Sequence, residues 1–317
     1  MAGVTETKND PKNVLYPGNP DWMKNLPESL HTTPLNELAI PGSHDSFTFY
    51  LDKTSDVGPD TSQAIRDLVK VFGGMAKDVI FKWSQTQSLS FADQLKAGIR
   101  YYDFRIASKP GSEDTYFIHC LYGSKVEASL QEINGYLEEH PTEVVILDFN
   151  HFYGMNESMH KQFMAVILET FGAKICPQKD MKTLTLDMLW QNKFQVVAIY
   201  QDDVVKDFDQ FWPASCIQSQ YANTTDPTKM VQFFEKTHSE NRPANTFQTY
   251  QGVLTPDATY IISRFSGSLK NDLVAKAGPV FVQWLKKKKR GNSGINICTM
   301  DFIEKESFIF EMLGMNK

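Results

Sequence analysis

The segment Val144-Val145-Ile146-Leu147-Asp148-Phe149 is the clearest indicator of the fold in this chain. Its first four residues are all apolar and show no alternation with polar ones, which is typical of a strand that is covered on both faces. Helix-like segments flank it at Lys125–His140 and Glu157–Phe171. A strand of this kind between two helices indicates a parallel sheet with helices packed on its faces.

The same alternation of apolar runs and amphipathic stretches continues along the chain. Seven further runs are interpreted as strands: Leu38–Pro41, Ile99–Ala107, Tyr116–Tyr122, Gln195–Tyr200, Ile217–Ala222, Thr249–Leu254 and Ile295–Phe302. Further helices are predicted at Ser62–Trp83, Phe91–Ala97, Leu184–Gln191, Pro227–His238 and Ala258–Lys289, the last with a break near Gly278-Pro279. Eight strand–helix units over roughly 280 residues match the size of a closed barrel. We predict an α/β fold, a single (β/α)8 TIM-like barrel over residues 31–317 after an N-terminal extension over residues 1–30. A doubly wound open sheet is the alternative.

Composition narrows the class of protein. The chain has 317 residues, of which 41% are hydrophobic, so it has enough apolar surface for a large core. Its net charge of −6 is unlike the basic excess of a general nucleic-acid binder. The four cysteines are too far apart for a zinc motif, which indicates free thiols. The polar N-terminus and the lack of a long apolar run favour a cytoplasmic protein with no transmembrane segment.

Several predicted strands end in polar residues that a buried strand does not normally carry. These residues are His44 and Asp45 after the first strand, Asp103 and Arg105 in the second, His119 in the third, Asn150 in the fourth and Asp301 in the eighth. The carboxyl ends of barrel strands converge on one face, where catalytic residues lie. Asp103 and Arg105 are two positions apart, so both should point to the same side. We therefore predict one polar site at this face.

Two histidines and one arginine suit the cleavage of a phosphodiester by a neighbouring hydroxyl group. A neutral imidazole removes the hydroxyl proton, a protonated imidazole supplies a proton to the departing oxygen, and arginine stabilises charge on the other phosphate oxygens. Asp45 and Asp301 are available to orient the two rings. The competing interpretation is structural, because a histidine at a strand end often only packs, and an aspartate after Gly42-Ser43 can cap a turn.

The segments that carry these residues resemble the X-domain of phosphatidylinositol-specific phospholipases C. They are Leu38–Ser46, Gln94–Ile106, Phe117–His119 and Glu143–His151, whose order and spacing follow the family through about residues 30–155. The C-terminal half resembles the small animal proteins that consist of an X-domain alone, at Trp212-Pro213, Ala222–Pro227 and Gly294–Ile297.

The resemblance implies a distorted form of the barrel and a role for each polar residue. It makes His44 the general base on the inositol 2-hydroxyl, and His119 the general acid towards the diacylglycerol oxygen. It makes Arg105 a phosphate-stabilising group, as in the bacterial branch of the family. Asp45 would support His119 and Asp301 would orient His44. We expect Asp103 and Asn150 to contact the substrate.

Two departures from the family bear on metal binding. The calcium-dependent branch has carboxylates at the positions of Arg105 and Asn150, so this chain lacks two ligands that a hard divalent ion would use. The bacterial branch has a lysine at the position of Asn150, so the chain matches neither branch fully. We predict chemistry that needs no metal and no cofactor.

The resemblance implies an inositol phospholipid as substrate, met transiently at a membrane surface. An aromatic rim at Phe47–Leu51 and at Phe152–Met155 is one hypothesis for membrane contact, and ordinary loop packing is the other. The basic run Lys286–Arg290 is compatible with anionic lipid or a nuclear address, but a solvated helix end away from the site is favoured. The alternative functions are a metal-dependent glycerophosphodiesterase-like enzyme and a non-catalytic inositide-binding protein.

Overall fold

Seven parallel strands form the centre of the molecule. The computed structural model describes residues 18–240 and 242–317. The parallel strands are β1 (Ile40–Ser43), β2 (Tyr101–Ser108), β5 (Val145–Tyr153), β6 (Val196–Tyr200), β7 (Ile217–Gln218), β8 (Phe247–Gly252) and β9 (Ile297–Met300). They follow the order β6-β5-β2-β1-β9-β8-β7. The fold is a distorted TIM-like barrel, as predicted.

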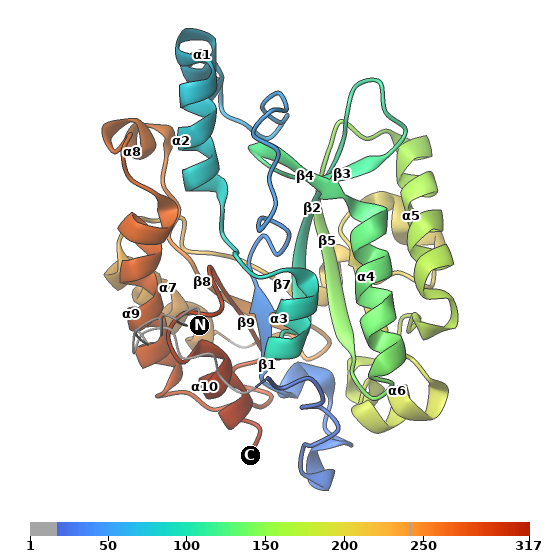
Figure 1. Ribbon diagram of the computed structural model, residues 1–317. Coiled ribbons are helices and arrows are strands. Elements are labelled where there is room, and N and C mark those ends of the chain that lie inside the picture. The colour runs from blue at the N-terminus through green and yellow to red at the C-terminus, as the bar shows by residue number, and fades with distance from the viewer. Residues whose placement is uncertain (1–17, 241) are drawn as a thin grey trace, which may run out of the picture.

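Helices surround these strands (Figure 1). They are α1 (Gln63–Phe72), α2 (Gly74–Ser84), α3 (Phe91–Ala97), α4 (Val126–Glu139), α5 (Glu157–Phe171), α6 (Leu186–Asn192), α7 (Pro227–Ser239), α8 (Ala258–Ser263), α9 (Ala275–Leu285) and α10 (Phe308–Gly314). Side-chain oxygens cap the amino ends of several, among them Ser62 for α1, Ser90 for α3 and Asp257 for α8. Figure 1 places α1, α2 and α8 at one end of the molecule and α6 and α10 at the other. No described helix is long and apolar enough to cross a membrane.

The prediction of a single strand at Tyr116–Tyr122 was wrong. This stretch contributes to two antiparallel strands, β3 (Thr115–His119) and β4 (Leu121–Lys125), and β3 pairs with the far end of β2. Cys120 makes the tight turn between them with a φ of 59°. Such a backbone conformation is uncommon for cysteine. The turn lacks the glycine or asparagine that would have marked it in the sequence. The predicted strand Ile217–Ala222 is also shorter, since β7 ends at Gln218.

Two predicted helices are divided differently. The segment Ser62–Trp83 forms α1 and α2, separated by Gly73 with a φ of 55°. The segment Ala258–Lys289 breaks after α8 rather than at Gly278-Pro279, because Pro279 lies inside α9. Pro279 is the fifth residue of α9, where its missing N–H removes a single hydrogen bond of the helix. A five-residue π turn precedes α9.

The described part of the N-terminal extension packs at the amino ends of β2 and β5. Trp22 is buried and its indole N–H donates to the carbonyl of Gly98 at 2.8 Å, so Trp22 anchors the segment. Glu143 accepts hydrogen bonds from the backbone amides of Met23 and Lys24. The same carboxylate binds the fully buried guanidinium of Arg100 at 2.8 Å. Residues 1–17 of the predicted extension lie outside the described residues.

Gly42 leaves room for two neighbouring side chains in the centre of the barrel. A side chain here would place its Cβ only 2.7 Å from the ring of Tyr101 and 3.0 Å from the methyl group of Thr299. Tyr101 and Thr299 extend from the two strands that flank β1. The glycine therefore allows both side chains to line the cavity described below.

Candidate active site

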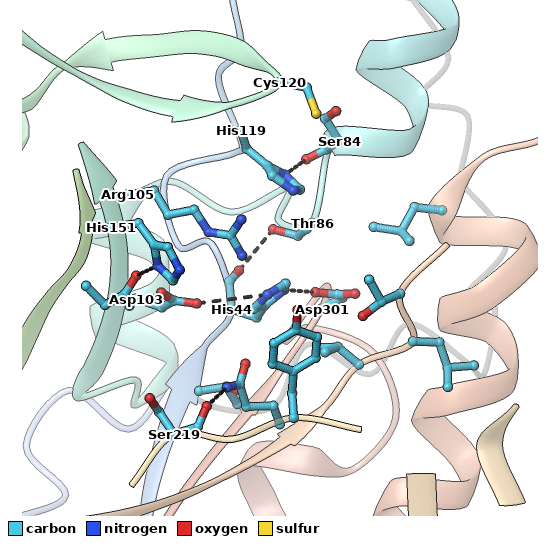
Figure 2. Close-up of a pocket in the computed structure, with 18 of the residues that line it drawn as sticks. His44, Ser84, Thr86, Asp103, Arg105, His119, Cys120, His151, Ser219 and Asp301 are labelled. Atoms are coloured by element: carbon cyan, nitrogen blue, oxygen red, sulfur yellow. Dashed lines mark hydrogen bonds and ion pairs between the residues drawn. The ribbon is translucent and has the colours of Figure 1, made fainter. Parts of the chain in front are cut away.

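A cavity of about 260 Å³ lies at the carboxyl ends of the parallel strands. Six of the seven predicted site residues line it, namely His44, Asp103, Arg105, His119, Asn150 and Asp301. The seventh, Asp45, is fully buried directly behind His44, His119 and Arg105. Figure 2 shows the two imidazoles and the guanidinium pointing toward a common centre. These strand ends thus converge on one cavity, as expected from their positions.

The Asp45 carboxylate joins the three basic groups. Its Oδ1 lies 2.6 Å from Nε of Arg105. Its Oδ2 lies 3.4 Å from Nε2 of His44 and 3.5 Å from Nε2 of His119. Burial alone would raise the pKa of Asp45, but Arg105, His119 and His44 hold it below its ordinary value. Asp45 therefore stays ionised between them.

His44 is fixed by a second carboxylate on the opposite side of its ring. Its Nδ1–H donates to Oδ1 of Asp301 at 2.8 Å, which directs Nε2 toward Oδ2 of Asp45. Burial would lower the pKa of His44, but the carboxylates of Asp45, Asp301 and Asp103 outweigh it and raise the pKa to about 9. The backbone carbonyl of His44 accepts hydrogen bonds from Thr86 and Gln87, which fix the position of the turn after β1.

His119 is oriented by a backbone group that sequence reasoning did not find. Its Nδ1–H donates at 2.8 Å to the carbonyl oxygen of Ser84, the last residue of α2. This leaves Nε2 facing Asp45. A backbone carbonyl is present at every residue, so nothing in the sequence marks Ser84 as this acceptor. His119 also comes from the β3–β4 hairpin rather than from a parallel strand.

Asp103 and Asn150 form the side of the cavity nearest β5. The side-chain amide of Asn150 donates to Oδ1 of Asp103. The backbone N–H of Asp45 donates to Oδ2 of Asp103 at 3.1 Å. His151 also lines the cavity and its Nδ1–H donates to the Asn150 side chain. Phe104 pairs with Phe149 but Arg105 pairs with His151, so Asn150 is the extra residue of a bulge. Simple alternation along the strand does not anticipate that Asn150 and His151 both face the site.

The site contains one cluster whose ligand types suit a divalent cation. His44, Asp45 and Asp103 have ligand atoms within 4.8 Å of one another. The fit to a metal is poor, because both Asp45 oxygens already contact Arg105 or an imidazole. Burial would lower the pKa of Arg105, but Asp45 and Asp103 raise it, so this cation is permanent.

Of the two hypotheses for the aromatic segments, ordinary loop packing is correct, because most of these side chains pack inward. Phe47 is fully buried and stacks on Phe117 at 4.8 Å between ring centroids, and Phe49 contacts Phe91 at 5.0 Å. Of Phe47–Leu51, Tyr50 is exposed. The segment Phe152–Met155 also packs inward, since Phe152 stacks on Tyr200 and Met155 packs on the core.

Exposed apolar side chains instead gather at the tips of α1, α2 and α8. They are Val71, Phe72, Met75, Ile262 and Phe265, and we call them the apolar tip. The rings of Phe72 and Phe265 lie 6.2 Å apart, so the two parts of the apolar tip are neighbours. Trp83 of α2 and Ile261 of α8 line the cavity, so the helices that bear the apolar tip also form its wall.

The basic run Lys286–Arg290 follows α9 and precedes β9. It therefore lies toward the amino end of β9, away from the cavity. Lys288 pairs with Glu235 at 2.9 Å and Lys286 with Glu311 at 3.7 Å. These contacts agree with a solvated helix end.

The chain belongs to the family of PI-PLC X domain-containing proteins. It is 43% identical over 298 residues to PI-PLC X domain-containing protein 3 of Mus musculus, covering 93% of each chain. It is 44% identical over 300 residues to protein 2 of the same family from Mus musculus, covering 94% of this chain and 88% of the relative. A comparison with models of protein families gives no match.

Solved structures of bacterial enzymes share the fold. A mutant of the phosphatidylinositol-specific phospholipase C from Staphylococcus aureus superposes with a TM-score of 0.64 at 14% identity, covering 95% of this chain and 97% of the other. The phosphatidylinositol-specific phospholipase C from Listeria monocytogenes gives a TM-score of 0.59 at 20% identity, covering 95% and 99%. The resemblance found in the sequence is thereby confirmed for the family and the barrel.

The geometry predicts an unusual titration of His44. By NMR, its ring protons should titrate with a midpoint of about 9, because three carboxylates stabilise the imidazolium form. Asp301→Asn removes one of these charges and should lower the midpoint, whereas Glu169→Gln on the exposed surface of α5 should not change it. A midpoint near ~6.5 in the unaltered protein, the value of a free histidine, would contradict this electrostatic account.

Proposed function

We propose that this protein is a phosphodiesterase that cleaves an inositol phospholipid into diacylglycerol and a cyclic inositol phosphate, which water can then open. The observation that carries the proposal is the convergence of the two imidazoles. Nε2 of His44 and Nε2 of His119 lie 3.4 and 3.5 Å from the same oxygen of Asp45, with Arg105 bound to its other oxygen. Two proton-transfer groups and one fixed cation thus line one cavity.

The reaction follows from the positions of these groups. His44 takes the proton of the inositol 2-hydroxyl, and the resulting oxygen forms a bond to phosphorus. The bond from phosphorus to the glycerol oxygen breaks, and His119 gives its Nε2 proton to that oxygen. Arg105 stabilises the charge on the phosphate oxygens that do not react. Each acid or base of this kind typically supplies about 10²–10⁴-fold in rate.

The raised pKa of His44 has a consequence for the reaction. Only the neutral imidazole can accept a proton, and with a pKa of about 9 this form is a minority at neutral pH. If His44 is the base, activity should therefore increase as the pH approaches 9. Asp301, bound to Nδ1, favours the protonated ring that forms during proton transfer and keeps Nε2 aimed at the substrate.

The Arg105–Asp45 pair favours chemistry that needs no metal, since it places a permanent cation where the phosphate charge must be neutralised. The cluster of His44, Asp45 and Asp103 keeps a metal-dependent glycerophosphodiesterase-like enzyme as the second candidate. That enzyme would lose its activity when a chelator removes the metal.

Replacing either histidine tests the assignment. With phosphatidylinositol as substrate, His44→Ala and His119→Ala should each reduce kcat by at least about 100-fold, because each removes a proton-transfer group. His140→Ala is the matched control, since His140 pairs with Asp21 next to the N-terminal extension. Thermal unfolding of each variant shows that the fold is retained. Robust turnover in either active-site variant would refute the assignment, as would an equal loss in His140→Ala.

We propose that the apolar tip makes the transient contact with the membrane that a lipid substrate requires. Val71 and Met75, the two most exposed of its side chains at 74% and 64%, lie on either side of the Gly73-Gly74 turn. A lipid leaving the bilayer could then enter the cavity past Trp83 and Ile261. Insertion of apolar side chains at the boundary between head groups and acyl chains is a common means of peripheral binding.

The double substitution Val71→Ser with Met75→Ser should weaken binding to phosphatidylinositol-containing vesicles by about tenfold or more. The reason is that binding then no longer transfers these two apolar side chains from water into the membrane. Turnover of a soluble, short-chain substrate should stay unchanged. Phe310→Ser is the control, since Phe310 is exposed on α10 at the opposite end of the molecule (Figure 1). Vesicle sedimentation measures the effect. Unchanged binding of the double variant would exclude the apolar tip as the contact surface.

A further inference from the structure

The hairpin that bears His119 has a strained turn directly after this residue. Cys120 alone joins β3 to β4, since His119 pairs with Leu121 in register. The φ of Cys120 is 59°, a left-handed conformation that residues other than glycine rarely adopt. Such a conformation persists where contacts from the surrounding structure hold it. Because His119 is the neighbour of Cys120, those contacts also determine where its imidazole lies.

The contacts come from residues 58–61, in the loop that joins β1 to α1. Oδ2 of Asp60 accepts a hydrogen bond from the backbone N–H of Cys120 at 2.6 Å. The carbonyl oxygen of Cys120 accepts from the backbone N–H of Gly58 at 2.7 Å and from the hydroxyl of Thr61 at 3.1 Å. Both polar groups of the Cys120 backbone are thus bound by this loop, and we call these three hydrogen bonds the turn clamp.

The turn clamp is held in place on both sides. Gly58 lies so close to β3 that a Cβ at this position would clash with the side chain of Ile118. The guanidinium of Arg66, in the first turn of α1, donates to the carbonyl of Gly58 at 2.7 Å and to that of Thr61 at 3.1 Å. The turn clamp is therefore fixed to the hairpin and to the start of α1.

His119 thus has two separate supports. The carbonyl of Ser84 at the end of α2 orients its ring, and the turn clamp fixes the backbone that follows it. In Figure 2, Ser84 and Cys120 both lie on the side of His119 away from His44. Loss of the turn clamp would let Nε2 of His119 move from its position 3.5 Å from Asp45.

We propose that Asp60 is a positioning residue for the general acid: its carboxylate binds the backbone of Cys120 and so keeps His119 where it can give its proton to the departing oxygen. The proposal rests on the proposed function for the role of His119. Asp60 is not among the described residues that line the cavity, so it acts through Cys120 and not on the substrate. Its Oδ1 is buried and has no hydrogen-bond partner in the described part of the chain.

The leaving group of the substrate distinguishes this role from a general loss of structure. With a soluble, short-chain phosphatidylinositol, Asp60→Ala should lower kcat about tenfold or more at a nearly unchanged KM, because a small displacement of a catalytic group can cost up to about 100-fold. With the 4-nitrophenyl ester of inositol 1-phosphate, whose leaving group departs without a proton, the loss should shrink to less than about threefold. The ratio of the two kcat values does not depend on the fraction of the variant that is folded. An equal loss with both substrates overturns the proposal.

Three further variants serve as reference and controls. His119→Ala should show the same dependence on the leaving group as Asp60→Ala, since both act on one proton transfer. Asp60→Asn retains an oxygen that accepts the N–H of Cys120 and should keep kcat within about threefold of the unaltered protein. Asp56→Ala removes an exposed carboxylate from the same loop without touching the turn clamp, and should change neither kcat. A loss in Asp60→Asn or Asp56→Ala equal to that in Asp60→Ala contradicts the assignment.

NMR of the ¹⁵N-labelled full chain keeps this inference separate from the proposed function. The signal of the His119 Nδ1–H, which is bound to Ser84, should broaden or disappear in Asp60→Ala, whereas that of the His44 Nδ1–H, bound to Asp301, should remain. An unchanged His119 signal in Asp60→Ala refutes the positioning role, even if the protein turns over phosphatidylinositol. A changed signal in a protein that turns over no lipid would refute the phosphodiesterase and support the positioning of His119 by Asp60.

Discussion

The buried carboxylate of Asp45 is the group on which the rest of the site depends. An anion without access to water is costly unless cations surround it, and Asp45 is met by Arg105 and by both imidazoles. Each of these contacts also fixes a group that the chemistry needs. Strand β2, which bears Arg105, and the hairpin that bears His119 bring the contacts together from segments far apart in the sequence.

The turn that carries Asp45 is held by a network of neutral hydrogen bonds. The Ser43 hydroxyl donates to the side chain of Gln94 at 2.7 Å, and the Gln94 amide donates to the Ser46 carbonyl at 2.8 Å. The Ser46 hydroxyl accepts from the backbone N–H of Asp103 at 2.9 Å. These contacts join β1, α3 and β2, so Asp45 can keep a positive φ of 40° in a fixed position. The segment therefore serves the fold and the site at once.

The barrel and the convergence of the polar strand ends could be predicted from the sequence. Both depend on where apolar runs occur along the chain and on which residues end them. Unbroken apolar runs such as Val144–Leu147 indicate buried parallel strands, and parallel strands place their carboxyl ends together. The hairpin at Cys120 escaped prediction, since its turn has no glycine and its two strands look like one apolar run. Ser84 escaped because it acts through its backbone carbonyl. For Phe47 and Phe49 the sequence left a surface rim and ordinary loop packing open, because only tertiary packing reveals that they stack inward.

The cavity joins an apolar wall, next to the apolar tip, to a charged centre at Asp45, and the proposed cleavage of a lipid phosphodiester requires both. The central claim is that the two imidazoles and Arg105 cleave a phosphodiester without a metal. Its most direct test is ³¹P NMR of phosphatidylinositol vesicles incubated with chelator-treated protein in the presence of excess chelator. The account predicts the signal of a cyclic inositol phosphate as the first product, at the rate seen without chelator. Loss of product formation in chelator, restored by adding a divalent cation, would contradict it.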